Sequence, residues 1–366
     1  MAPIRIGILG LSPGQWAANA HLPYLQSPQS KFEIVAVCNS SSESAKKSIK
    51  NLGLAESTKA YGNPEDLASD ANVDLIVCTV RVDRHYKTIT PAIKAGKNVL
   101  VEWPLGKNLQ EAEELLRLSK EHRTKLAAVG CQGRFDATFR TVKKLIDDGK
   151  IGKVLSTTVV GPCGLTGSPA LGPSTEYLSQ IEVGGNLVTI PFMHFMDSFT
   201  RVLGEPESFN SVLSVQRPSI DIVDSDGSVV KKNLKATAHD QASVQGKLTS
   251  GAIFSVSIRG GDPFKDEPGV DWRIYGEKGE IWVKAPTMHM QISGGTSIQL
   301  HDFEKDEKTE VEFMKEAFSE MPPMTRNVAR LYEAIAAEDA SAFCTFEQAV
   351  ERHRFVDALY KQNGVY

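Results

Sequence analysis

The chain lacks the features that mark a membrane, secreted or nucleic-acid-binding protein. No apolar run in its 366 residues approaches the length of ~20 residues that is needed to cross a bilayer. Its first residues lead directly into an apolar segment, without the basic and apolar regions of a secretory signal. The net charge of −4 gives no basic surface for nucleic-acid phosphates. We expect a cytoplasmic protein, with a nuclear pool left open, that binds neither membrane nor nucleic acid directly.

Cysteine is scarce: the chain has five, an odd number, at scattered positions. They are Cys38, Cys78, Cys131, Cys163 and Cys344. Their spacing matches no metal-ligand motif and suggests no disulfide framework. The sequence therefore predicts a reducing compartment and no metal site.

What the chain has is the composition of a globular protein, with 41% hydrophobic and 23% charged residues. It contains no internal repeats and no low-complexity segments. Its length allows two domains, each with its own core. We place the boundary near residue 150. A Rossmann domain over 1–150, completed by helices at about 324–366, precedes an α/β domain for substrate and oligomerisation over 151–323.

The first strand and the loop after it predict a nucleotide-binding unit. The run Ile4–Leu9 is apolar and β-branched, which is typical of a buried strand, and a turn begins at Gly10. A helical segment follows from Trp16, so the order is that of a dinucleotide-binding βαβ opening. Ser12 stands where a second glycine is usual, and Gly14 allows a shifted loop. This motif alone also fits an ordinary strand and turn.

The second strand, Phe32–Cys38, ends at Asn39 instead of the acidic residue that would hold a ribose 2′-hydroxyl. A neutral amide tolerates either a hydroxyl or a 2′-phosphate. Lys46 and Lys47 follow one helical turn later and can meet a phosphate, although a solvated helix face is their ordinary role. The sequence therefore leaves NAD and NADP open, with a slight lean to NADP.

Two further strands, residues 73–80 and 98–102, also end in polar or aromatic residues. His85 follows the first of them and is interpreted as a helix-start residue beside the cofactor, with a catalytic role as the alternative. Glu102-Trp103-Pro104 closes the second. Ligand-binding loops lie at the carboxyl ends of strands in such sheets. We expect these segments to lie beside the same ligand.

The second half of the chain has short alternating runs separated by turns, which predict an open, mostly antiparallel sheet. We count residues 288–292 among these strands. An open sheet face is a candidate surface for a homodimer.

One segment of this half, residues 184–197, carries a candidate acid or base in His194. Pro191 predicts that a helix begins there. The apolar residues around His194 equally fit a histidine in the core. Tyr177 is a second candidate, and Glu176 and Glu182 are either replacement acids or ordinary loop residues.

These motifs together resemble the Gfo/Idh/MocA oxidoreductase family, whose members usually carry Glu-Lys-Pro and a Gly-Gly…Asp-x-x-x-His segment. The resemblance implies a nicotinamide coenzyme, a small hydroxyl or carbonyl substrate, and roles for Glu102, Pro104 and His194. Two of the family's polar groups are missing here, because Trp103 replaces the lysine and Ile190 replaces the aspartate.

The same departures, with Gln132-Gly133-Arg134, resemble the subgroup of fungal galactose-regulon repressors. The resemblance to that subgroup implies a non-catalytic sensor that binds the coenzyme and also binds an acidic activator peptide. Two functions thus stay open. One is an NAD(P)-dependent oxidoreductase for a sugar, polyol or similar compound, and the other is a regulator.

The candidate residues fall into two groups. The catalytic candidates are His194 and Tyr177. The cofactor candidates are Gly10, Leu11, Ser12, Trp16, Asn39, Ser40, Thr79, Val80, His85, Glu102, Trp103, Pro104 and Gln132.

Overall fold

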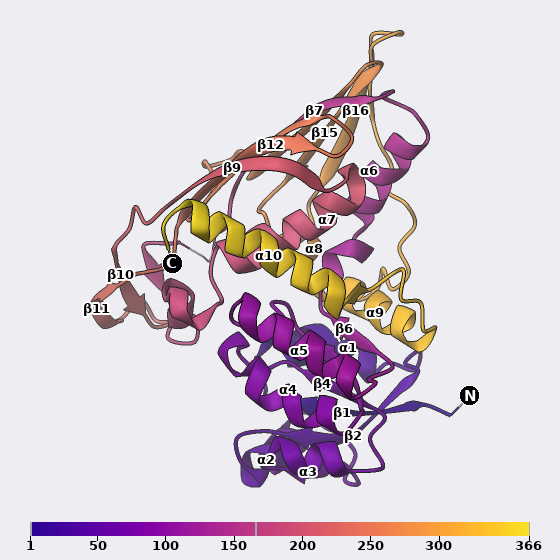
Figure 1. Cartoon of the computed structure of the whole chain (residues 1–366), viewed down its shortest axis with the longest axis vertical. Coiled ribbons are helices and arrows are strands. Elements are labelled where there is room, and N and C mark those ends of the chain that lie inside the picture. The colour runs from indigo at the N-terminus through magenta and orange to yellow at the C-terminus, as the bar shows by residue number, and fades with distance from the viewer. Residues whose placement is uncertain (1, 165–166, 366) are drawn as a thin grey trace. The chain divides into compact units, whose positions relative to one another are not determined.

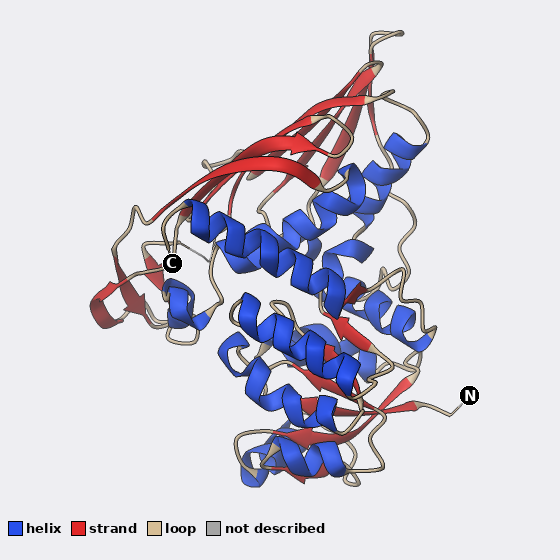
Figure 2. Cartoon of the chain, viewed as in Figure 1, coloured by secondary structure: helices blue, strands red, loops and turns tan. Residues whose placement is uncertain are grey.

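The computed structural model describes residues 2–164 and 167–365. The chain divides into two compact units, the first built from Met1–Gln132 with Ala317–Arg354 and the second from Gly133–Glu316 with Phe355–Tyr366. Figure 1 labels the helices and strands of both units, and Figure 2 colours them by type. No helix in the described part of the chain is long and apolar enough to span a bilayer.

The first unit contains a seven-stranded sheet in the order β18-β6-β5-β4-β1-β2-β3. Its strands are β1 (Ile4–Leu9), β2 (Phe32–Cys38), β3 (Lys59–Tyr61), β4 (Leu75–Cys78), β5 (Asn98–Val101), β6 (Ala127–Val129) and β18 (Cys344–Thr345). All pairs are parallel except β18 with β6. This order is that of a Rossmann sheet, so the predicted fold class of this half is confirmed.

The helices of this unit pack on the sheet and on one another. They are η1 (Ala17–His21, a π-helical turn), α1 (Leu22–Leu25), α2 (Ser42–Asn51), α3 (Pro64–Ser69), η2 (Val82–Arg84), α4 (His85–Lys94), α5 (Leu109–Glu121), α9 (Pro323–Ala336) and the start of α10 (Phe346–Gln362). Helix α9 packs on η1 and α1, which brings the C-terminal part of the chain against its first helical segment.

The second unit has a large sheet of eight strands in the order β17-β16-β15-β14-β7-β13-β12-β9. They are β7 (Val154–Pro162), β9 (Pro206–Ser214), β12 (Gln241–Leu248), β13 (Ile253–Arg259), β14 (Val270–Gly276), β15 (Gly279–Ala285), β16 (Ser297–Asp302) and β17 (Glu307–Glu310). Among the described strands of this sheet, only β13 and β7 pair in parallel, so the predicted mostly antiparallel sheet is confirmed.

Aromatic residues of this sheet pack against aromatic residues of the helices α6 (Ala137–Asp147) and α7 (Met193–Leu203). Trp272 on β14 is fully buried, and its ring lies against Phe139 of α6 and against Phe195 and Phe199 of α7. Alternate residues of β14 therefore point inward to the core, as a one-sided sheet requires.

Two sequence expectations about this unit were wrong. Residues 288–292 form no strand, because the short helix α8 (Met290–Ser293) begins there. Helical structure near Pro191 begins earlier, at η6 (Val188–Phe192), because the Asn186 side chain accepts hydrogen bonds from the backbone N–H groups of Val188 and Thr189. The sequence also gave no sign of a small sheet made by β8 (Ala170–Leu171), β10 (Ser219–Val223) and β11 (Val229–Lys235).

Candidate functional site

The loop after β1 is bonded tightly to the loops after β2 and β4. Gly10 has φ +94°, and a Cβ on it would lie 2.7 Å from Val80 Cγ1. The Thr79 hydroxyl donates to the Leu9 carbonyl at 2.9 Å, and the buried Leu11 accepts from the Asn39 amide. The turn at Gly10 thus needs a residue that has no side chain and accepts positive φ.

The Asn39 amide has one orientation that satisfies its donors. Its Nδ2 donates to the Leu11 carbonyl at 2.9 Å and to Ser48 Oγ at 3.0 Å. Its Oδ1 is buried and bonded by no described residue. The neighbouring Ser40 is exposed, as are Lys46 and Lys47. The atom that Asn39 leaves open is therefore a hydrogen-bond acceptor.

Among the buried polar atoms of the first unit that no described residue bonds, two more follow strands of the sheet, besides others such as Ser27 Oγ and Thr124 Oγ1. One is Nε1 of Trp16, the residue that directly precedes η1, and the other is Oε1 of Gln132, a side chain only 2% exposed. Ser12, in the same loop as Trp16, is half-buried. Such orphaned atoms are rare in folded proteins unless a ligand or water bonds them. Together with Asn39 they follow strands β1, β2 and β6, at the carboxyl edge of the sheet.

His85, the first residue of α4, is buried between two backbone carbonyls. Its Nδ1 lies 2.8 Å from the Pro104 oxygen and its Nε2 lies 2.8 Å from the Val80 oxygen. Burial lowers the pKa of His85 below its usual value, so the ring is neutral and donates to one carbonyl at a time. These two contacts tie the loop after β4 to the loop after β5.

Glu102, which directly follows β5, is bonded to His21, and His21 is bonded in turn to Tyr332; the sequence did not single out either residue. Its Oε1 lies 2.9 Å from His21 Nε2, and His21 Nδ1 lies 2.9 Å from the Tyr332 hydroxyl. The carboxylate has room because Gly130 carries no side chain, since a Cβ there would lie 2.8 Å from Glu102 Oε1. This makes a buried phenol–imidazole–carboxylate chain inside the first unit.

Trp103, at the position where the family's lysine is expected, is 6% exposed and packs on His353 of α10 with ring centroids 4.9 Å apart. Burial, and the neighbouring His85, lower the pKa of His353 to about 3. Its Nε2 is another buried atom that no described residue bonds. The indole is thus held against a neutral imidazole.

In the second unit, His194 lies in the first turn of α7 and is 7% exposed. A second histidine, His289 at the start of α8, lies near it. Burial and the proximity of His194 lower the pKa of His289 to about 4, so His289 is neutral at pH 7. The structure therefore pairs His194 with an imidazole that the sequence did not suggest.

The other catalytic candidate, Tyr177, lies at the edge of the apolar cluster around Leu171 and Ile222, and Ile190 packs on the same cluster. The position of the family's aspartate is therefore occupied by an apolar contact. Glu176 forms an exposed ion pair with Lys231, which makes it a surface residue in this fold.

The second unit also contains a buried ion pair between Arg134 and Asp197. Arg134 Nε and Nη2 each donate to one Asp197 oxygen at 2.7 Å, and both side chains are at most 3% exposed. This pair fixes the segment after β6 to helix α7.

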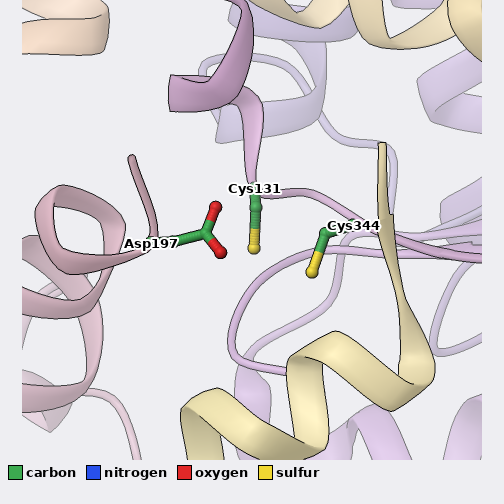
Figure 3. A group of neighbouring side chains, drawn as sticks. All are labelled: Cys131, Asp197 and Cys344. Atoms are coloured by element: carbon green, nitrogen blue, oxygen red, sulfur yellow. The ribbon is translucent and has the colours of Figure 1, made fainter. Parts of the chain in front are cut away.

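Two thiols lie side by side in the first unit, as Figure 3 shows: the sulfurs of Cys131 and Cys344 are within 4.8 Å. Cys344 is on β18 and pairs with Val129 of β6, which brings it next to Cys131. Asp197, also labelled in Figure 3, belongs to the second unit. Within either unit, the residues described bring no three potential metal ligands together.

The sequence missed His21, Tyr332, His289 and His353 for a common reason. Each acquires its role from a partner far along the chain, such as the 311 residues that separate His21 from Tyr332. The only local signal was a histidine, His21, five residues after Trp16 of the predicted helical segment.

Two family models match consecutive parts of the chain. A model described as the oxidoreductase family with an NAD-binding Rossmann fold (GFO_IDH_MocA) matches residues 4–130. A model of the Gal80p C-terminal domain matches residues 138–285.

Individual relatives include both regulators and a dehydrogenase. The galactose/lactose metabolism regulatory protein GAL80 of Kluyveromyces lactis is 31% identical over 80% of this chain and 66% of its own length. Its namesake from Saccharomyces cerevisiae is 26% identical over 99% of this chain and 93% of its own length. Dehydrogenase aclE of Aspergillus oryzae is 29% identical over 98% of this chain and 95% of its own length.

Solved structures give the same two kinds of relative. A super-repressor mutant of Gal80p from Saccharomyces cerevisiae superposes with a TM-score of 0.88 at 25% identity, covering 100% of this chain and 97% of that one. Levoglucosan dehydrogenase in complex with NADH and L-sorbose superposes with a TM-score of 0.77 at 16% identity, covering 100% and 97%. The second likeness shows the fold alone.

Proposed function

Since the chain belongs to the Gfo/Idh/MocA oxidoreductase family, in a subgroup that resembles Gal80, we propose that its first unit binds a nicotinamide dinucleotide and supports hydride transfer. The substrate is a sugar, polyol or similar small hydroxyl or carbonyl compound. The bound coenzyme supplies the hydride chemistry, and the protein supplies position and a path for the proton.

The observation that carries this proposal is the set of buried polar atoms without partners. Trp16 Nε1, Asn39 Oδ1 and Gln132 Oε1 come from three loops at one edge of a parallel sheet. A dinucleotide bound at this edge supplies ribose hydroxyl, phosphate and amide groups that bond such atoms. The Gly10 turn, with no Cβ and positive φ, fits a phosphate approaching the backbone.

Asn39 supports NAD over NADP, which reverses the slight lean drawn from the sequence. Its two amide hydrogens are already donated to Leu11 and Ser48, so it offers only an acceptor oxygen. An acceptor bonds a ribose hydroxyl but not a 2′-phosphate. We expect NAD to bind at least tenfold more tightly than NADP by calorimetric titration, and Asn39→Ala to reduce that ratio. Tighter binding of NADP contradicts this assignment.

His194 is the acid–base candidate in the second unit by resemblance, and Tyr177 is a weaker one because it lies against apolar side chains. Turnover tests the enzyme proposal directly. Purified protein with NAD and a panel of aldoses, polyols and lactones should produce NADH, and the rate of His194→Ala measures what that histidine contributes. The matched control is His301→Ala, an exposed histidine on β16.

The alternative is a coenzyme-binding regulator that does not turn over substrate. It is favoured by the Gal80 relatives and by the two missing polar groups, since Trp103 and Ile190 both lie in packed surroundings. Saturable coenzyme binding, with no NADH formed from any substrate and with capture of an acidic activator peptide, would support this function.

The outward face of the large sheet is proposed as a homodimer surface. Val160, Val212 and Ile253 are between 57% and 67% exposed there. The strand registers place Val212, Ser243, Ser257 and Val160 along one row across four strands. Sedimentation of the wild type and of Val160→Lys tests this proposal.

A further inference from the structure

A chain of hydrogen bonds links three buried side chains of the first unit. Tyr332 comes from α9 and His21 from the end of η1, and Glu102 directly follows β5. They are 0%, 1% and 9% exposed, and the two bonds between them are both 2.9 Å long. Buried groups of this kind persist in folded proteins when their hydrogen bonds are satisfied.

When Glu102 is a carboxylate and the His21 ring is neutral, the protons of this chain have one arrangement. Glu102 only accepts, so the His21 Nε2–H donates to it, and His21 Nδ1 then carries a lone pair. The Tyr332 hydroxyl donates to that lone pair. Burial and the nearby Glu102 raise the pKa of Tyr332 well above its usual value, so the phenol keeps its proton. Tyr332 thereby fixes the tautomer of His21, and His21 fixes the carboxylate.

The other carboxylate oxygen, Oε2, is bonded by no described residue, and the Glu102 side chain is 11% exposed. The carboxylate lies over Gly130, where a Cβ would be 2.9 Å from Oε2. It therefore sits at the carboxyl edge of the sheet, between strands β5 and β6. One oxygen is held by His21, and no described residue bonds the other.

We propose that Glu102 is the proton acceptor of the hydride-transfer reaction, with His21 and Tyr332 as positioning residues. This proposal rests on the oxidoreductase function proposed above. The substrate O–H bond breaks and an O–H bond to Glu102 Oε2 forms. The carbinol carbon loses its hydrogen with two electrons to the oxidised nicotinamide ring, so the alcohol is oxidised to a carbonyl and the coenzyme is reduced.

A carboxylate suits this role better than the histidine pair of the second unit. The proton neutralises Glu102, whereas a proton on His194 would place a cation beside His289, a buried imidazole that stays neutral at pH 7. Glu102 also needs no residue from the second unit to hold it.

The first test does not depend on turnover. The oxidised nicotinamide ring is cationic and the reduced ring is neutral, so a nearby carboxylate favours NAD+ over NADH. Glu102→Gln should raise the ratio of the Kd for NAD+ to that for NADH about tenfold, and the exposed Glu113→Gln should leave it unchanged. An unchanged ratio in Glu102→Gln overturns the proposal, whether or not the protein turns over substrate.

The second test uses turnover and its pH dependence. Glu102→Gln should lower kcat at least 100-fold for alcohol oxidation and remove the acidic limb of its pH profile. Gly130→Ala should lower kcat by displacing the carboxylate, while Gly172→Ala, where the nearest atom is 3.7 Å from the added Cβ, should not.

Tyr332→Phe should retain the acidic limb of the pH profile but shift it to another pH. Histidine ¹⁵N spectra of this variant should show that His21 no longer has a single tautomer.

The outcomes separate the two proposals. Wild-type protein without turnover, but with the altered coenzyme ratio in Glu102→Gln, refutes the oxidoreductase function and keeps Glu102 beside the ring. If kcat of Glu102→Gln stays within twofold of the wild-type value and its pH profile keeps the acidic limb, Glu102 is not the proton acceptor. Loss of that limb in His194→Ala instead assigns the proton to the second unit.

Discussion

Gly10 occupies a position where both backbone conformation and space exclude other residues. Its φ is +94°, and an added Cβ would lie 3.0 Å from the Val80 backbone nitrogen as well as 2.7 Å from its side chain. Gly14, four residues later, also has a positive φ of +75°, but nothing lies within 4 Å of its Cβ position. The two glycines thus separate the effect of conformation from the effect of close packing.

Gly10→Ala should therefore lower the free energy of unfolding by about 2–3 kcal/mol, whereas Gly14→Ala should lower it by about 1 kcal/mol. Urea unfolding of both variants measures the difference. Coenzyme binding should be lost in Gly10→Ala and retained in Gly14→Ala. Equal stabilities would show that the contact with Val80 does not constrain the loop.

The sequence singles out Gly10, Asn39, Glu102 and Trp103 as candidates because each comes within two residues after a strand whose apolar pattern is local. What it could not give is the partner of each side chain. The sequence predicts that the segment of Glu102 lies beside a ligand, but the contact of Glu102 with His21 depends on how η1 and α9 pack. Asn39 was treated as able to meet a phosphate, yet its donors are taken by Leu11 and Ser48.

The segment between β6 and α6 is fixed to helix α7 by the Arg134–Asp197 pair. Removing one partner leaves a buried charge, which costs about 3–5 kcal/mol in comparable proteins. We expect Asp197→Leu or Arg134→Met to lower the free energy of unfolding by about that amount.

The double variant is the decisive control for this pair. With both charges replaced by apolar side chains, it should be more stable than either single variant. Denaturant unfolding of the three proteins checks this. If the two single losses simply add, the pair contributes no coupling and the account of α7 is wrong.

The type of an element was predictable where its apolar pattern extended over many residues. The boundary of an element was less predictable where a single short side chain determined it. The parallel strands of the first unit follow from continuous apolar runs, and the antiparallel sheet follows from alternation. The start of η6 depended on Asn186, whose capping role was not recognised, and α8 depended on packing around Met288 and Met290, both at most 1% exposed.

Across the whole molecule, several histidines are buried in neutral form, which makes stability depend on pH. Burial lowers the pKa of His353 to about 3 and of His289 to about 4, and it also lowers that of His85. The unfolded chain binds protons near the ordinary value of 6.5 and the folded chain does not. The free energy of unfolding therefore falls as the pH drops below 6.5, by at most about 1.4 kcal/mol per pH unit for each histidine.

Thermal unfolding should accordingly show Tm decreasing steadily from pH 7 to pH 5. His353→Phe, which keeps a ring against Trp103, should have a shallower decrease, because one titrating group is gone. A Tm that does not change between pH 7 and pH 5 would contradict the burial of these rings.

The central claim is that the first unit binds a nicotinamide dinucleotide through the loops after β1, β2 and β6. Calorimetric titration of the full chain with NAD+ and with NADH tests it most directly. The account predicts saturable binding of one coenzyme per chain, weakened by Asn39→Ala. Absence of a saturable signal with NAD+, NADH, NADP+ and NADPH would contradict it.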